Sequence, residues 1–168
     1  MAREIGLGYP GGPKIDKVSR EGNPCAIDLP RGKVSGSRYD FSFSGMKSSV
    51  LNYLNTCKMK NIAISVPDVA ASFQQAVVDV LVSHAMWAVE EFGLTKFALA
   101  GGVASNTKLR EEMEKACAQR NVRFYCPPPI LCTDNAAMIG SAAYYEYIKG
   151  VRSGLDLNAK PGLRLGER

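Results

Sequence analysis

Histidine and the motifs of common hydrolases are almost absent from this sequence. His84 is the only histidine in 168 residues, and the five cysteines include no CxxC pair. Without an HExxH pair or a Cys/His cluster, the sequence supplies no complete zinc site of its own. A P-loop, a GxSxG elbow and a Ser/His/Asp set are also missing, which excludes the enzyme classes that depend on them.

Long apolar runs are missing as well. No window approaches the roughly 20 apolar residues of a membrane-spanning helix, and residues 1–5 lack the apolar segment of a secretory signal. We therefore expect no membrane association, and the odd number of cysteines, five, favours reduced thiols in the cytoplasm. The formal net charge of +5 fits a polyanionic partner, and fits a basic protein without such a partner nearly as well.

The C-terminal half alternates between helical and strand patterns. Helices are predicted over 65–93, with Ser65 as N-cap, over 105–117, and from Thr133 or Asp134 to Lys149. Apolar runs over 96–100 and 122–126 predict strands, the first of them buried. This order predicts an α/β layer structure with a parallel pair of strands.

The N-terminal half is less regular. Residues 13–20 predict a short helix with Pro13 in its first turn, and 46–58 predict a second helix. Between them, 26–29 and 39–43 predict irregular strands. The single histidine lies on the apolar face of the long helix, which favours a hydrogen-bonded core residue.

The strongest local signal is the loop over residues 99–106, where a strand runs into Gly101-Gly102 and then a helix. Bare backbone N–H groups at a helix start attract phosphate, and glycines let a ligand lie close. A tight turn without any ligand explains the two glycines equally well.

Two further loops precede helices. In residues 128–135, Asp134 is a candidate metal ligand or catalytic carboxylate, although a helix cap is the commoner role for Asp there. Cys132 in the same loop has no histidine near it in sequence and is interpreted as a small buried residue. Residues 8–13 could be only a turn, with Asp16 and Lys17 as solvated helix charges.

Five blocks in register carry a family resemblance, residues 8–13, 41–47, 70–74, 99–106 and 132–139. Each block alone is weak, but together they cover the chain up to its tail. They resemble the TsaD family, the tRNA N6-adenosine threonylcarbamoyltransferases, once labelled O-sialoglycoprotein endopeptidases or glycoproteases.

The resemblance implies a fold and an activity. It implies one ribonuclease-H-like lobe of the actin-like ATPase (ASKHA) fold, an α/β lobe with helices packed on a mixed sheet. Residues 1–150 would be the C-terminal lobe of the transferase, and 151–168 a partly extended tail. The family transfers a threonylcarbamoyl group from threonylcarbamoyl-adenylate to N6 of adenosine 37 in tRNAs that read ANN codons.

The resemblance also implies site residues. Gly12 and Asp16 would contact the ribose of the adenylate (or of ATP or ADP), and Asn106 with Gly101-Gly102 would hold the nucleoside. Asp134 would bind one divalent metal, iron or zinc. The family's HxxxH pair and Ser-Gly-Gly phosphate loop belong to an N-terminal half that is not in this sequence. We therefore expect a fragment that is inactive alone, with the metal absent or weakly held.

Expected partners are tRNA, proteins of the threonylcarbamoyladenosine pathway, and a second copy bound through an exposed inter-lobe surface. Alternative interpretations are a nucleotide-binding lobe of another actin-like ATPase, such as a sugar kinase, or a non-catalytic scaffold of a tRNA-modifying complex. A protease is disfavoured because neither a nucleophile nor a zinc helix is present. The candidate tRNA-binding cations are Arg31, Lys33, Arg38, Lys149, Arg152, Lys160, Arg164 and Arg168.

Overall fold

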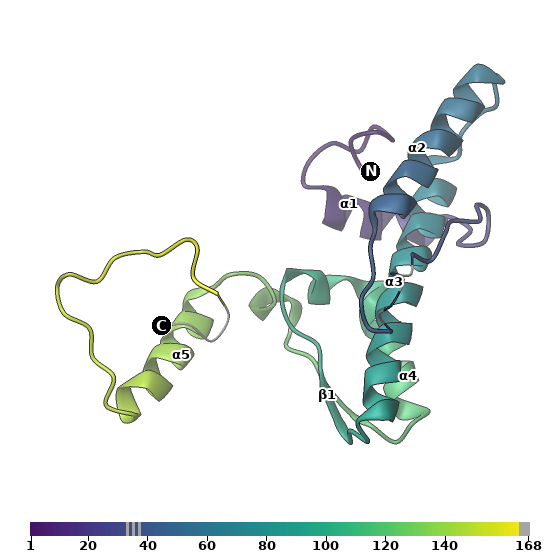
Figure 1. Ribbon diagram of the computed structural model, residues 1–168. Helices are drawn as coiled ribbons and strands as arrows, with labels where there is room; N and C mark the ends of the chain where they lie inside the picture. Colours follow the sequence, from purple (N-terminus) through teal and green to yellow (C-terminus); the bar gives the residue numbers. More distant parts are fainter. Residues whose placement is uncertain (33, 35, 37, 165–168) are drawn as a thin grey trace. The chain divides into compact units, whose positions relative to one another are not determined.

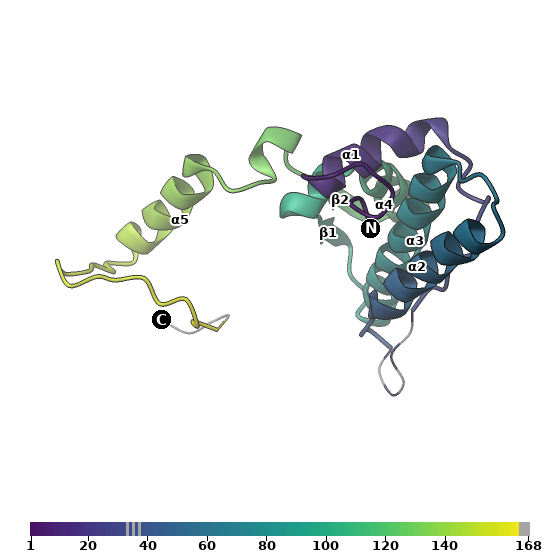
Figure 2. The ribbon, with the colours of Figure 1, turned by 90° about the horizontal axis from the view of Figure 1, so that it is seen from above.

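The structure, a computed structural model, describes residues 1–32, 34, 36 and 38–164. It divides into two compact units, Met1–Thr133 and Asp134–Arg168, each of which is described by itself. The helices, strands and short 3₁₀ turns are traced in Figures 1 and 2. In chain order they are α1 (Gly11–Val18), a 3₁₀ turn (Ser19–Glu21), α2 (Ser44–Met59), α3 (Val66–Glu91), β1 (Lys96–Ala98), a 3₁₀ turn (Gly102–Ser105), α4 (Thr107–Ala118), β2 (Arg123–Tyr125), a 3₁₀ turn (Pro129–Leu131) and α5 (Ala136–Ile148).

The long helix α3 begins and ends where the sequence predicts. The Ser65 side chain accepts a hydrogen bond from the Asp68 N–H, which is the N-cap arrangement. At the other end Gly93 has a φ of 59°, and the Leu94 N–H reaches the Val89 carbonyl at 2.9 Å. This is a Schellman motif, which terminates a helix and satisfies its last carbonyls.

Helix α3 is the apolar centre of the first unit. Its N-terminal part packs with α1 and α2, and both ribbon views show α2 running beside it (Figures 1 and 2). Its C-terminal part packs against α4 through a second cluster. His84 is buried here, and its Nδ1 donates to the Val80 carbonyl at 2.8 Å, which confirms the predicted core histidine. Because α3 is buried on both sides, it holds α1 and α4 in one unit.

The sheet is smaller and less covered than predicted. Strand β1 pairs with β2 in parallel, with Phe97 opposite Phe124, as expected. The described residues contain a two-stranded parallel sheet instead of the expected mixed one. The prediction of a buried strand over 96–100 is wrong, because Lys96 and Ala98 are exposed. Alternate residues face opposite sides of a strand, and only the side with Phe97 and Phe124 meets the cluster of α3 and α4.

The irregular strands predicted over 26–29 and 39–43 are not strands. An extended segment needs a neighbour that pairs its backbone groups, and a side chain takes that role for the first segment. The Ile27 N–H donates to the Ser72 hydroxyl of α3 at 3.1 Å. In the second segment, the Phe41 ring packs edge-on against His84, with ring centroids 5.2 Å apart. Contacts with α3 therefore replace the expected pairing.

The second unit contains α5 and residues 149–164, which form turns and irregular backbone. The predicted cap at Thr133 or Asp134 is wrong: the side chain of Asn135 accepts from the Met138 N–H at 3.0 Å. Asn and Asp cap helices about equally well, so the sequence alone did not separate these neighbours. The predicted boundary between a lobe over 1–150 and a tail over 151–168 stays a prediction. No helix among the described residues is long and apolar enough to span a membrane.

The start of α3 is locked to the turn that follows α1. The Asp68 carboxylate accepts the Asn23 N–H at 2.8 Å, and this bond, together with one from Ser65, lowers the pKa of Asp68. Next to it the backbone passes so closely that a Cβ on Gly22 would lie 2.1 Å from the Pro67 carbonyl oxygen. Glycine is required at this crossing for lack of space.

We predict that Gly22→Ala destabilises the chain by about 1–3 kcal/mol, because the backbone at Pro67 must move to admit the methyl group. The matched control is Gly45→Ala in α2, where an added Cβ meets nothing within 4 Å. That variant should be more stable than the parent by roughly 0.5–1 kcal/mol. Denaturant unfolding of the three proteins measures both changes, and equal effects of the two substitutions would contradict the close crossing.

Candidate functional site

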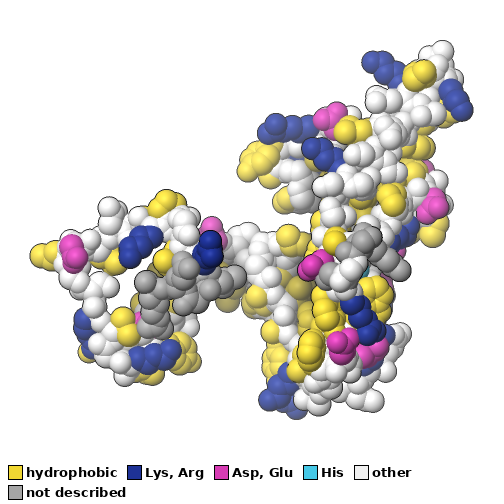
Figure 3. Space-filling model, in the orientation of Figure 1, with side chains coloured by type: hydrophobic (Ala, Val, Ile, Leu, Met, Phe, Trp, Pro, Cys, Tyr) yellow, Lys and Arg dark blue, Asp and Glu magenta, His cyan; other side chains and the backbone are white. Residues whose placement is uncertain are grey.

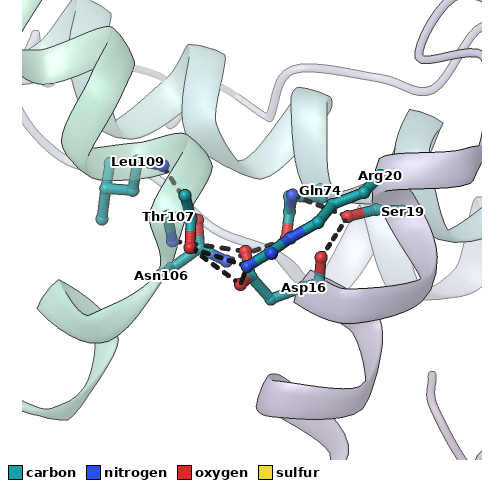
Figure 4. Close-up of polar contacts among 7 residues, drawn as sticks. All are labelled: Asp16, Ser19, Arg20, Gln74, Asn106, Thr107 and Leu109. Atoms are coloured by element: carbon teal, nitrogen blue, oxygen red, sulfur yellow. Dashed lines mark hydrogen bonds and ion pairs between the residues drawn. The ribbon is translucent and has the colours of Figure 1, made fainter. Parts of the chain in front are cut away.

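Asp16 joins α1 to the start of α4. Its carboxylate accepts the Thr107 N–H at 3.2 Å, the Thr107 hydroxyl at 3.1 Å and the Arg20 guanidinium at 3.1 Å (Figure 4). The side chain is only 14% exposed. A carboxylate at the first N–H groups of a helix also favours the helix dipole. Asp16 is therefore a structural link as well as a candidate ligand-binding group.

The buried side-chain amide of Gln74 connects α3 to the same junction of α1 and α4. Gln74 donates to the Ser19 hydroxyl at 2.8 Å and accepts from the Asn106 amide at 2.8 Å (Figure 4). Asn106 in turn accepts the Leu109 N–H at 2.9 Å and so caps α4. Gln74 was not predicted as a site residue. Its signal in the sequence is weak, because Ser72 and Gln75 place other polar side chains beside it in the long helix.

The predicted ligand-binding residues of the first unit come together. Gly12, Asp16, Gly102 and Asn106 line one cavity of about 650 Å³. Gly101 directly precedes Gly102, and its φ of 89° with ψ of 173° is a conformation that residues with a side chain disfavour. A cavity of this size is within the usual range for small-molecule sites, which runs from about 300 to 1,000 Å³. The juxtaposition joins residues nearly 90 positions apart in sequence.

The cavity offers both acceptors and cations. A carboxylate has about four lone-pair positions, and the three hydrogen bonds to Asp16 leave one for a ligand hydroxyl. Lys17 and Arg20 line the same cavity, and the Arg20 side chain is largely exposed. The wall can therefore accept hydrogen bonds from hydroxyl groups while its cations attract an anionic group.

Asp134 belongs to the second unit and is exposed. Across the described part of the chain, no three His, Cys, Asp or Glu side chains gather in a way that could hold a metal ion. A carboxylate binds a transition metal firmly only when other ligands complete the shell. Asp134 as a metal ligand therefore stays a prediction, and the described residues do not form a metal site by themselves.

We predict that Asp16 and Thr107 are energetically coupled by about 1 kcal/mol, as expected for a part-buried, charge-assisted contact. A double-mutant cycle with Asp16→Ala and Thr107→Val, read by denaturant unfolding, measures this coupling. Asp28→Ala is the matched control, because the Asp28 side chain is fully exposed and 3.6 Å from Arg31. That control should leave the unfolding midpoint unchanged. Additive effects of the Asp16 and Thr107 substitutions would contradict the link.

Comparisons with known proteins identify the family of the chain. A model of the TsaD family, described as tRNA N6-adenosine threonylcarbamoyltransferase, matches residues 1–141. The transferase of that name from Clostridium botulinum (strain Hall) is 60% identical over all 168 residues, which cover 49% of the relative. The one from Clostridium kluyveri (strain ATCC 8527) is 59% identical over 169 aligned positions and is covered to 50%. The chain thus spans about half the length of the curated relatives it matches.

A solved structure supports the fold alone. The crystal structure of T. kodakarensis HypF matches 84% of this chain and 18% of its own with a TM-score of 0.59, at 24% sequence identity. The fold is thus shared with part of a larger protein. The relatives at 60% identity and the family match over residues 1–141 go further: this chain belongs to the TsaD family of tRNA N6-adenosine threonylcarbamoyltransferases.

Proposed function

We propose that this chain forms the nucleotide-binding half of a tRNA N6-adenosine threonylcarbamoyltransferase. The whole protein would move threonylcarbamoyl from threonylcarbamoyl-adenylate to N6 of adenosine 37 in ANN-decoding tRNAs. The observation that carries the proposal is the cavity of about 650 Å³ that Gly12, Asp16, Gly102 and Asn106 line together. The chain would then be one ribonuclease-H-like lobe of the actin-like ATPase fold.

The proposed binding mode follows from the chemistry of the residues that line this cavity. Asp16 would accept a hydrogen bond from a ribose hydroxyl with the lone pair that its own partners leave over. Gly12 would let the sugar approach the backbone of α1, since no atom lies within 4 Å of its missing Cβ. Lys17 and Arg20 would attract the phosphate of the adenylate. Asn106 would face the nucleoside from the other side while capping α4.

The metal would be shared with the other half of the whole protein. Asp134 would supply one ligand to a divalent ion, iron or zinc, and the remaining ligands would come from outside this chain. When bound, such an ion draws negative charge from the reacting phosphate and carbonyl groups. Because the described residues do not complete its shell, no catalytic step is assigned to it.

tRNA binding would use the basic residues of both units. Arg31 is already paired with Asp79 and Arg38 with Glu91, each at 2.8 Å, which weakens their pull on phosphates. In the second unit the Arg152 guanidinium lies 3.9 Å from the centre of the Tyr147 ring. Lys149, Lys160 and Arg164 are further candidates there. Lys33 and Arg168, also predicted to take part, lie outside the described residues.

An apolar surface fits a chain that needs further partners. Figure 3 shows apolar side chains gathered around β1 in the first unit, and a cavity of about 620 Å³ opens among Phe41, Leu81, Phe97, Leu99 and Met113. Exposed apolar surface of this kind commonly marks an interface. In the whole protein it would be covered by the other half or a partner protein, and the isolated chain would self-associate through it.

The central test is a transfer assay. The chain is joined to the N-terminal half of its Clostridium botulinum relative and given threonylcarbamoyl-adenylate, metal, partner proteins and an ANN-decoding tRNA. We expect modified adenosine from the joined protein and none from the isolated chain. Asp134→Ala should lower the rate roughly 100-fold, equivalent to about 3 kcal/mol of transition-state stabilisation.

Asp156→Ala, a second exposed carboxylate of the same unit, is the matched control and should leave the rate unchanged. Nucleotide binding without any product would favour a lobe of another actin-like ATPase. A joined protein that binds neither nucleotide nor metal would favour a non-catalytic scaffold. Product from the isolated chain would refute the proposal that the site needs groups from both halves of the whole protein.

The tRNA part of the proposal has its own test. The binding constant for tRNA should fall by roughly 0.7–0.9 log unit per log unit of salt concentration for each phosphate contact. Lys160→Gln should reduce that slope by about one contact, because it removes one cation. Lys58→Gln at the end of α2 is the control and should not change it. Filter binding between low and physiological salt measures the slopes, and a flat dependence would remove tRNA as a partner of these residues.

A further inference from the structure

Arg110, on the second turn of α4, contacts both loops that follow the strands. Its Nε donates to the Ala104 carbonyl, and its Nη2 donates to the Pro127 carbonyl and lies 3.1 Å from the Cys132 sulfur. Ala104 belongs to the glycine loop after β1, whereas Pro127 and Cys132 belong to the loop after β2. One guanidinium group thus spans the two parallel strands at their carboxyl ends.

Both loops are held tightly at the points that Arg110 contacts. Ala104 is fully buried and Cys132 is 2% exposed. The Cys132 thiol lies 3.5 Å from the Pro128 carbonyl, so it closes its loop from within. Burial raises the pKa of the neighbouring Cys126 thiol, and the Arg110 charge opposes that shift.

We propose that Arg110 is a positioning residue that sets the glycine loop and the Cys132 loop in register with each other. Gly101 and Gly102 are three and two residues before Ala104, and Asp134 is two residues after Cys132. The inference rests on the proposed function, in which the glycine loop holds the nucleoside and Asp134 binds the metal. Arg110 would then position both the glycine loop and the segment that leads to Asp134.

The geometry of arginine matters here. A guanidinium presents several N–H donors in a fixed planar fork, and Arg110 uses two of them, Nε toward the Ala104 carbonyl and Nη2 toward the Pro127 carbonyl. A lysine would keep the charge but not the fork, because its ammonium is a single point on a flexible chain. A glutamine would keep one donor group and no charge.

The test compares Arg110→Gln and Arg110→Lys with the parent chain in two measurements. The first is the rate at which N-ethylmaleimide labels each cysteine, read by peptide mass spectrometry. We expect Cys132 to react about tenfold faster in Arg110→Gln, since a tenfold rise in local opening needs only a modest loss of contacts. Arg110→Lys should fall between Arg110→Gln and the parent.

Cys117 on the same helix is fully buried and serves as the internal reference. The matched control variant is Arg120→Gln, an arginine at the end of α4 that pairs with Glu90 at 2.6 Å. It should leave the labelling of Cys132 unchanged. If Cys117 became reactive together with Cys132 in both Arg110 variants, Arg110 would support the fold in general and the positioning role would be overturned. An unchanged Cys132 rate would overturn it as well.

The second measurement is the affinity for AMP by calorimetry. We expect Arg110→Gln to bind AMP about tenfold more weakly, with part of the loss restored in Arg110→Lys and none seen in Arg120→Gln. Equal AMP affinity in the parent and Arg110→Gln would refute the proposal that Arg110 positions the glycine loop. A parent chain that binds no AMP would count against the proposed function, while the labelling pattern would still decide whether Arg110 positions the two loops.

Discussion

The first unit depends on a buried amide that must be satisfied. Gln74 lies in the N-terminal half of α3 and is only 8% exposed. An unpaired buried amide would cost several times the net gain of an ordinary hydrogen bond. Its two partners, Ser19 and Asn106, come from the segments on either side of α3. The position of the elements that carry these partners is therefore constrained by polar geometry as well as by apolar packing.

The hydrogen bonds of Gln74 also fix the position of Asn106, which lines the cavity of about 650 Å³. Asn106 is simultaneously the partner of Gln74 and the N-cap of α4, so the start of α4 cannot shift without leaving both roles. Asp16 then reaches the Thr107 N–H across the same junction. The groups proposed to receive a nucleoside are thus supported by hydrogen bonds behind them, which favours a preformed site over one that must order on binding.

The chain covers about half the length of the curated relatives it matches. The glycine loop and Asp16 form one wall, whereas Asp134 is a single carboxylate without companion ligands among the described residues. Phe97 and Leu99 open onto an apolar cavity instead of a closed core. The described residues thus supply the polar groups of a nucleotide-sized cavity but not a complete set of metal ligands.

The sequence by itself determined that the helices form, and it determined where the long helix α3 begins and ends. Ser65 and Gly93 bound α3 as predicted, because caps and turns depend on a few neighbouring residues. Only the tertiary structure decided that Gly12 and Asn106 share a cavity and that Gln74 joins the helices, since these contacts link distant positions. The strand burial and the cap of α5 were predicted wrongly for a related reason: layer coverage and the choice between adjacent capping residues depend on what packs nearby.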